Sequence, residues 1–301
     1  MADMKVTMCG VEFKNPITVA SGTFGSGMEY DEFLDLNRLG AVTTKGVAAV
    51  PWEGNPTPRV AETPSGMLNA IGLQNPGIDV FLERDIPFLK KYDTRIIVNV
   101  CGHSEEEYLA VVDRLNDADI DMMEINISCP NVKEGGIAFG TDPKGVEAIT
   151  GAIKSHAKKP VIMKLSPNVT SIADIARAAE AGGADALSLI NTITGMKIDI
   201  RRRTFLLANR TGGLSGPAIH PVAVRMVYEA AQAVSIPIIG MGGVATHEDA
   251  VELMLAGATM VAVGSANFGN PLATTEIIEG MERYAEDMGI KHIADIVGRV
   301  K

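Results

Sequence analysis

Cysteine is scarce in this chain, and long apolar runs are missing. Its 301 residues include three cysteines, Cys9, Cys101 and Cys129, an odd number with no C-x-x-C pair. We therefore expect neither an internal disulfide framework nor a metal or iron–sulfur centre held by cysteines of this chain. No apolar run of about 18 residues occurs, and the first residues, M-A-D-M-K-V-T, lack the apolar segment of a signal peptide. These absences predict a cytoplasmic protein that does not bind a membrane.

An excess of basic residues is also missing. The 27 lysines and arginines are outnumbered by 37 acidic residues, which gives a formal charge of −10 and disfavours binding to nucleic acid. Aromatic residues make up 5% of the chain, while 46% is hydrophobic, so we expect a sizeable aliphatic core. Length alone allows one large α/β barrel or two ordinary domains. No shift in composition marks a boundary, and we predict a single domain over residues 1–301.

Patterns of metal sites and of Ser-His-Asp catalysis are absent as well. The five histidines are scattered without ligand spacing, and neither a triad order nor a nucleophile elbow is visible. We therefore predict no metal site.

Eight strand-like runs follow a short hairpin over residues 5–14, and helical segments separate them. The runs cover residues 17–21, 41–46, 95–100, 122–128, 161–166, 186–191, 237–242 and 260–265. Helix-capping patterns occur at Ser104 with Glu107 and at Thr246 with Asp249, and a further helix is expected at about 78–91.

Three predicted helix ends look alike and carry glycine before the next strand, in L-G-A-V (39–42), A-G-G-A-D (181–185) and A-G-A-T (256–259). We expect a left-handed glycine to close each helix. Eight such units in roughly 250 residues predict an α/β fold of the (β/α)8 (TIM) barrel type. A doubly wound open sheet is the alternative, but no G-x-G-x-x-G follows the first strand. The long connections 47–94 and 192–218 are predicted to wall the active-site face of the barrel.

A polar residue or a glycine stands at every predicted strand end, where barrels carry their working groups. These residues are Ser21, Lys45, Asn99, Asn126 with Cys129, Lys164, Asn191 with Thr192, Gly242 with Gly243, and Gly264 with Ser265. The last four predict a phosphate site, because glycine amides favour an anion there; tight turns are the plainer explanation of the glycines. We expect one lysine to meet an anionic substrate and the other to stabilise negative charge on a cofactor.

Cys129 is a candidate catalytic residue. It follows the strand in E-I-N-I-S-C-P-N, lies beside Asn126, and precedes a glycine-rich stretch suited to a mobile cover. A small, buried, inert cysteine is the alternative.

These motifs resemble the class 1 dihydroorotate dehydrogenases, most closely the class 1B catalytic subunit, over residues 4–300. The likeness is carried by N-A-I-G-L-Q-N-P-G, I-N-I-S-C-P-N, K-L-S-P-N, I-N-T, T-G-G-L-S-G-P-A-I and I-G-M-G-G-V. The family is an FMN-containing (β/α)8 barrel that oxidises dihydroorotate to orotate in pyrimidine synthesis. The resemblance implies that Cys129 removes the C5 proton while hydride passes from C6 to flavin N5.

The resemblance also assigns binding residues. It implies pyrimidine contacts from Lys45, Asn69, Ala70, Ile71, Gly72, Leu73, Asn126, Asn191 and Thr192. Lys164 corresponds to the lysine at the flavin N1/O2 edge. Further FMN contacts are implied for Ser21, Lys45, Gly46, Asn99, Asn126, Ile190 and Gly216, and the phosphate cradle for Gly242, Gly243, Gly264 and Ser265.

Class 1B members pair with an iron–sulfur and FAD subunit and pass electrons to NAD, commonly as a homodimer core within a heterotetramer. The resemblance implies the same here, and the FAD and 2Fe-2S cluster would belong to the partner. A class 1A enzyme that works alone with fumarate, a phosphate-binding lyase or isomerase without flavin, and a flavin-binding scaffold are the alternatives. Arg201 to Arg203 read as a solvated face, or as a contact with an acidic partner.

Overall fold

Eight parallel strands form a sheet that curls into a nearly closed barrel. The structure is a computed structural model that describes residues 2–127 and 140–300. The strand order is β3-β16-β15-β10-β9-β8-β7-β4. All eight predicted strands are confirmed: β3 (Ile17–Val19), β4 (Ala41–Thr43), β7 (Arg95–Val100), β8 (Met122–Asn126), β9 (Val161–Lys164), β10 (Ala186–Leu189), β15 (Ile238–Met241) and β16 (Met260–Val263).

The two edges of this sheet meet at β3 and β4. The Thr18 and Thr43 hydroxyls lie 2.9 Å apart, and Gly40 N donates to Ile17 O at 3.0 Å. The TIM-barrel prediction is therefore confirmed.

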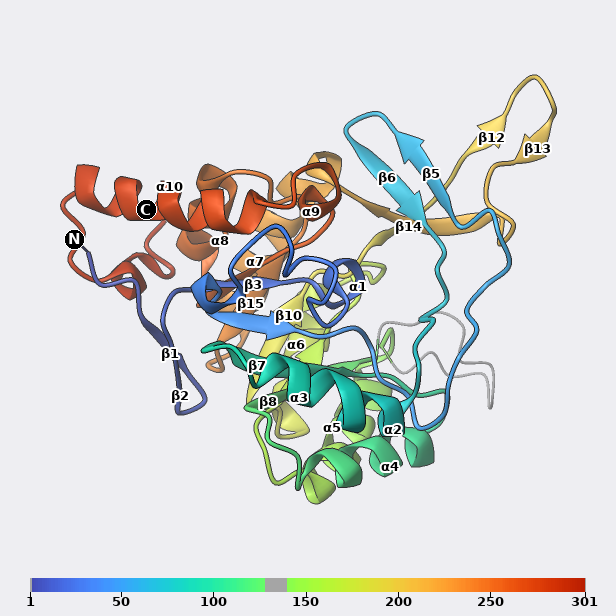
Figure 1. The fold of residues 1–301 in the computed structure, drawn as a ribbon, viewed down its shortest axis with the longest axis horizontal. Coiled ribbons are helices and arrows are strands. Elements are labelled where there is room, and N and C mark those ends of the chain that lie inside the picture. The colour runs from blue at the N-terminus through green and yellow to red at the C-terminus, as the bar shows by residue number, and fades with distance from the viewer. Residues whose placement is uncertain (1, 128–139, 301) are drawn as a thin grey trace.

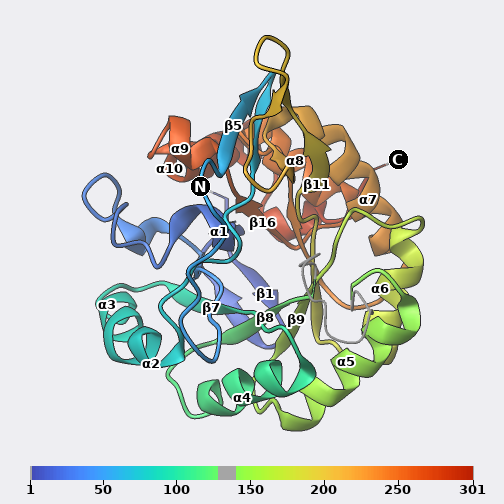
Figure 2. The same ribbon diagram turned by 90° about the vertical axis from the view of Figure 1, so that its right-hand side faces the viewer.

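Helices surround the barrel, as Figure 2 shows. The layer consists of α4 (Glu105–Leu115), α5 (Pro143–His156), α6 (Ile172–Ala181), α7 (His220–Ala233), α8 (His247–Ala256) and α10 (Ala273–Asp287). The helix predicted at 78–91 is interrupted: α2 (Ile78–Val80) runs through a π turn, η2 (Phe81–Asp85), into α3 (Ile86–Leu89). The first crossover, which is fully described, carries only α1 (Ser21–Phe24) and a 3-10 turn, η1 (Leu36–Arg38). Short turns complete the set: η3 (Pro217–Ile219), α9 (Ala266–Gly269) and η4 (Ile293–Ile296).

The predicted helix ends are confirmed in part. Thr246 and Asp249 form a full capping box, whereas the Glu107 carboxylate accepts from His103 N instead of the Ser104 amide. Gly183 and Gly257 are left-handed, with φ of 91° and 127°. The prediction for Gly40 is wrong. Its φ lies outside the left-handed region, and glycine is needed because a Cβ there would lie 2.1 Å from Asn15 O.

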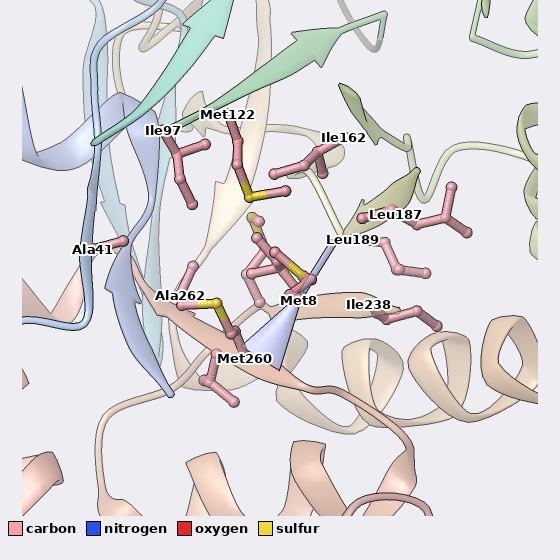
Figure 3. Close-up of a cluster of buried hydrophobic side chains, with 14 of the residues drawn as sticks. Met8, Ala41, Ile97, Met122, Ile162, Leu187, Leu189, Ile238, Met260 and Ala262 are labelled. Atoms are coloured by element: carbon pink, nitrogen blue, oxygen red, sulfur yellow. The ribbon is translucent and has the colours of Figure 1, made fainter. Parts of the chain in front are cut away.

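The N-terminal hairpin closes the amino end of the barrel. It consists of β1 (Val6–Met8) and β2 (Val11–Phe13), which pair antiparallel. The Cys9 thiol donates to Asp185 O at 3.2 Å, and Arg95 Nε donates to Glu12 O at 2.9 Å, so the hairpin is fixed to the starts of β10 and β7. Figure 3 shows Met8 among buried side chains of the barrel strands. This packing leaves the carboxyl ends of the strands as the open face.

The two long insertions pair with each other into a second sheet. β5 (Val60–Thr63) and β6 (Gly66–Asn69) come from the first, and β11 (Ile193–Met196) and β14 (Thr211–Ser215) from the second; the antiparallel order is β11-β14-β6-β5. Figure 1 shows this sheet and the N-terminal hairpin at opposite ends of the barrel. β12 (Ile198–Asp199) and β13 (Thr204–Phe205) form a projecting hairpin whose turn exposes Arg201 to Arg203. In the part of the chain that the structure describes, no helix combines the length and apolar character needed to cross a membrane.

Candidate active site

A cavity of about 440 Å³ lies at the carboxyl ends of the barrel strands and beneath the second sheet. This volume is in the range of small-molecule sites. Most of the predicted site residues line it: Ser21, Lys45, Asn69, Ala70, Ile71, Gly72, Leu73, Asn126, Lys164, Ile190, Asn191, Thr192, Gly216, Gly242, Gly243, Gly264 and Ser265. The prediction that both insertions wall the site is confirmed, because Met67, Thr194 and Gly213 also line the cavity.

Among the described residues, two of the predicted site residues do not line the cavity. These are Gly46, which follows β4, and Asn99, which lies near the end of β7. A Cβ on Gly46 would lie 3.0 Å from Asn99 Oδ1, so these two residues pack against each other. Cys129 lies outside the described residues, and its catalytic role stays a prediction.

Lys164 is brought to the floor of the cavity by strand register. It ends β9 and pairs with Asn126 of β8 on one side and with Ser188 of β10 on the other. Its ammonium group donates to Ser21 Oγ at 3.3 Å and lies 3.7 Å from Glu124 Oε2. The lysine is thus a buried, paired cation with one side on the cavity.

Glu124 is a residue that the sequence interpretation missed. It lies in the middle of β8, behind the cavity wall, and its side chain is 1% exposed. Its carboxylate accepts hydrogen bonds from Asn99 Nδ2 at 2.5 Å and from Ser188 Oγ at 2.7 Å. The sequence did contain a signal for it, namely an acidic residue within the apolar strand M-M-E-I-N. Because a charged residue is rarely buried without a partner, Glu124 could have been expected to pair with other polar groups of the site.

Lys45 supplies a second cation to the same cavity, so the two lysines share one mouth as predicted. Its pKa is lowered from the ordinary 10.5, mainly by burial, and the positive charges of Lys164 and Arg59 lower it further; Cys101 opposes this shift. Among the described residues, no hydrogen bond or ion pair of the Lys45 ammonium is found. An anion that enters the cavity would therefore gain from this charge.

Glycines that follow β14 and β15 form another part of the cavity wall. Gly216, Gly242 and Gly243 have φ of 103°, 131° and 71°, values that favour glycine. A Cβ on Gly243 would lie 2.8 Å from Gly216 O and 2.9 Å from His220 N. His220 fixes this turn, because its Nδ1 lies 2.8 Å from Gly242 O while Nε2 lies 3.1 Å from Glu252 on α8. The turn places backbone at the cavity with no side chain in between.

Amides define the opposite wall. The segment 69–73 is held by Asn55, which donates to Ala70 O at 3.0 Å, and by Asn75, which donates to Leu73 O at 2.8 Å. Asn168 donates to Thr192 O at 3.1 Å and accepts from Thr194 N. Asn55 and Asn168 both line the cavity and were not predicted; a lone loop asparagine carries no distinguishing sequence signal.

Neither described cysteine lies at this wall. Cys9 sits in the N-terminal hairpin, and burial raises the pKa of its thiol to about 11. Cys101 is buried behind Gly46. Within residues 2–127 and 140–300, no group of three histidine, cysteine or acidic side chains is placed to hold a metal.

The family model described as dihydroorotate dehydrogenase matches residues 3–284, which is most of the chain. The chain belongs to the dihydroorotate dehydrogenase family. A protein of Lachnoclostridium phytofermentans named dihydroorotate dehydrogenase B (NAD(+)), catalytic subunit, is 67% identical over 98% of this chain and 99% of its own length. Proteins of the same name from Alkaliphilus metalliredigens and Alkaliphilus oremlandii are 62% and 61% identical, each over at least 98% of both chains. These family members match the class that the sequence motifs predicted.

Proposed function

We propose that this chain oxidises dihydroorotate to orotate in pyrimidine biosynthesis, as the catalytic subunit of an NAD-linked enzyme. The observation that carries the proposal is the convergence of two lysines, a row of amides and a glycine-lined turn on one cavity. The names of the relatives described above support this reaction and NAD as the acceptor over fumarate. Membership of a dehydrogenase family argues against the alternative of a lyase or isomerase without flavin.

The residues of the cavity fit a flavin mononucleotide. The left-handed turn at Gly242 and Gly243 offers backbone amides to a phosphate, at the place where barrels commonly bind one. Lys164 presents a buried ammonium to the cavity, which suits a group that gains negative charge. We therefore assign Ser21, Lys164, Gly216, Gly242, Gly243, Gly264 and Ser265 to its binding. When bound, FMN supplies the acceptor for the hydride and its two electrons.

The amide wall and Lys45 would bind the pyrimidine. Asn69, Asn126 and Asn191 can each donate and accept hydrogen bonds, which matches the alternating carbonyl and N–H groups of the ring. The Lys45 ammonium would pair with the carboxylate of dihydroorotate. Burial lowers the pKa of Lys45, and a carboxylate bound beside the ammonium would raise this pKa again, so the ion pair would strengthen binding of the carboxylate.

Cys129 remains the proposed base for the C5 proton. An unperturbed cysteine has a pKa of about 8.5 and is mostly protonated at neutral pH. The thiolate is the form that takes up the proton, so the rate of substrate oxidation should rise with pH until this thiol is ionised.

Electrons would leave through a second subunit. The printed names of the relatives call them catalytic subunits, which implies another subunit. We propose that this partner carries FAD and a 2Fe-2S cluster, because the three cysteines of this chain are too few to hold a cluster.

The test is to purify the chain, record its visible spectrum, identify the released flavin, and then add dihydroorotate without oxygen. The proposal expects bound FMN that bleaches as one orotate forms per flavin. A colourless protein would favour a lyase or isomerase and contradict the proposal. A yellow protein that does not bleach would point to a scaffold or another substrate, and would equally refute it.

A further inference from the structure

Glu124 is a buried charge that the proposed reaction does not use. Its side chain lies behind the cavity wall, and both carboxylate oxygens are occupied: Oε2 by Asn99 and Oε1 by Ser188. A buried carboxylate costs several kcal/mol unless hydrogen bonds and an opposite charge offset the loss of water. A carboxylate at this buried position is therefore unfavourable for packing alone, which points to a role in function.

The position of Glu124 follows from the strand register. Glu124 and Asn126 lie two residues apart on β8 and therefore face the same side of the sheet, toward the barrel interior. Asn99 of β7 pairs with Glu124, and Lys164 of β9 pairs with Asn126. The carboxylate consequently lies one layer below the lysine that the cavity exposes, 3.7 Å from its ammonium.

The charges around the cavity are unbalanced without this carboxylate. Lys45 and Lys164 both line the wall, and the charge of Lys164 contributes to lowering the pKa of Lys45. Glu124 is the carboxylate that pairs with Lys164 in the described part of the chain. It thus offsets one of the two positive charges and fixes the direction of the Lys164 side chain.

We propose that Glu124 is a positioning residue that sets the reduction potential of the bound flavin through Lys164. This inference rests on the proposed function. The Lys164 ammonium stabilises negative charge on a reduced flavin, and the Glu124 carboxylate behind it weakens that stabilisation. The flavin is thereby kept easier to reoxidise, which favours transfer of its electrons to an acceptor.

The decisive variant is Glu124→Gln, which removes the charge and keeps the shape. The network can accept it, because Asn99 Oδ1 is buried and has no hydrogen-bond partner among the described residues. A rotation of the Asn99 amide would let this oxygen accept from the new glutamine N–H. Ser188→Ala is the matched control, since it removes one hydrogen bond to the carboxylate and leaves the charge.

The flavin potential of each protein is measured by anaerobic reduction with dithionite against a reference dye, which requires no catalytic activity. For Glu124→Gln we expect the equilibrium ratio of reduced to oxidised flavin at a given potential to rise at least tenfold, or about 30 mV for a two-electron couple. For Ser188→Ala and for Glu124→Asp, which keep the charge, we expect less than a threefold change. Equal potentials in the wild-type and Glu124→Gln proteins would overturn the inference.

If Glu124→Gln does not fold, a second pair keeps the test open. Glu124→Met removes the charge, fills a similar volume and keeps Lys164 in place, and it is measured beside the control Ser188→Met. Glu124→Met should raise the ratio of reduced to oxidised flavin at least tenfold, whereas the control should not; an unchanged or lower ratio in Glu124→Met refutes the role of Glu124. Wild-type protein that lacks a flavin, or does not bleach with dihydroorotate, refutes the proposed function itself, whereas a bleaching wild type with unchanged variants refutes only the inference.

Discussion

Alanine substitutions at Gly264 and Gly243 can distinguish an effect on cofactor binding from an effect on folding. Both residues line the cavity at the end of a barrel strand. Gly264 has a φ outside the left-handed region, and a Cβ there would make an ordinary contact of 3.6 Å with Ala20 Cβ. Gly243 is left-handed, and its Cβ would lie 2.8 Å from Gly216 O. Alanine should therefore be tolerated by the fold at position 264 and should destabilise it at position 243.

The magnitudes follow from these two environments. Gly264→Ala should change the free energy of unfolding of the flavin-free protein by no more than about 0.5 kcal/mol, because it meets no strain. Gly243→Ala should lower it by about 2–4 kcal/mol, since the left-handed backbone alone costs about 1–2 kcal/mol and the backbone contact adds to this. If a phosphate bonds the amides at the end of β16, the new methyl group of Gly264→Ala displaces it. Losing one hydrogen bond to a charged group costs about 1.5–3 kcal/mol, or roughly tenfold to 150-fold in affinity.

The assay is a titration of flavin-free protein with FMN, followed by quenching of flavin fluorescence, alongside urea denaturation. Riboflavin, which lacks the phosphate, is the control ligand. Gly264→Ala should weaken FMN binding at least tenfold, keep its stability, and leave riboflavin binding nearly unchanged. Wild-type FMN affinity in Gly264→Ala would refute the placement of the phosphate at this strand end.

Three further predictions concern other residues. In a variant without the other two cysteines, Cys9 should react only slowly with iodoacetamide at pH 8, because its pKa of about 11 leaves roughly one thiol in a thousand ionised. The labelling rate should rise about tenfold per pH unit up to about pH 11. Fast labelling at neutral pH would contradict the burial of this thiol in the hairpin. His220→Ala should lower the free energy of unfolding, measured in urea, by about 1–3 kcal/mol. His220→Asn should lower it less, because the asparagine amide can still donate a hydrogen bond to Gly242 O; equal losses in the two variants would refute that contact. Lys45→Met should weaken orotate binding at least tenfold yet stabilise the flavin-free protein. Because the folded-state pKa of Lys45 is lowered, this stability gain should be largest at neutral pH and vanish as pH rises past about 10.5, and a gain independent of pH would contradict the buried charge.

The barrel was predictable from sequence because its strands are short apolar runs with abrupt ends. A strand such as Val161–Lys164 is buried on both faces, so its hydrophobic run and the polar residue that ends it are both visible in the sequence. Because parallel strands place their carboxyl ends at one edge, Lys45 and Lys164 could be expected at one mouth.

The second sheet was not predictable in the same way. Its strands carry glycine, threonine and asparagine, as in T-G-G-L-S (211–215), and β14 pairs with β6 from a distant insertion. Such pairing depends on contacts that no local pattern records. The helix at 78–91 was expected to be continuous, but Pro87 has no N–H to donate, and a π turn precedes it. Glu124 was missed because its partners Asn99 and Ser188 come from other strands.

The central claim is that dihydroorotate is oxidised in the cavity at the strand ends with the thiol of Cys129 as base. Its most direct test is anaerobic rapid mixing of the purified chain with dihydroorotate, following flavin absorbance in one turnover, for wild type, Cys129→Ala and the control Cys101→Ala. The account predicts fast bleaching in wild type and in the control, and bleaching at least 100-fold slower in Cys129→Ala, in line with the contribution of about 10²–10⁴ made by a positioned base. Bleaching of Cys129→Ala at the wild-type rate would contradict it.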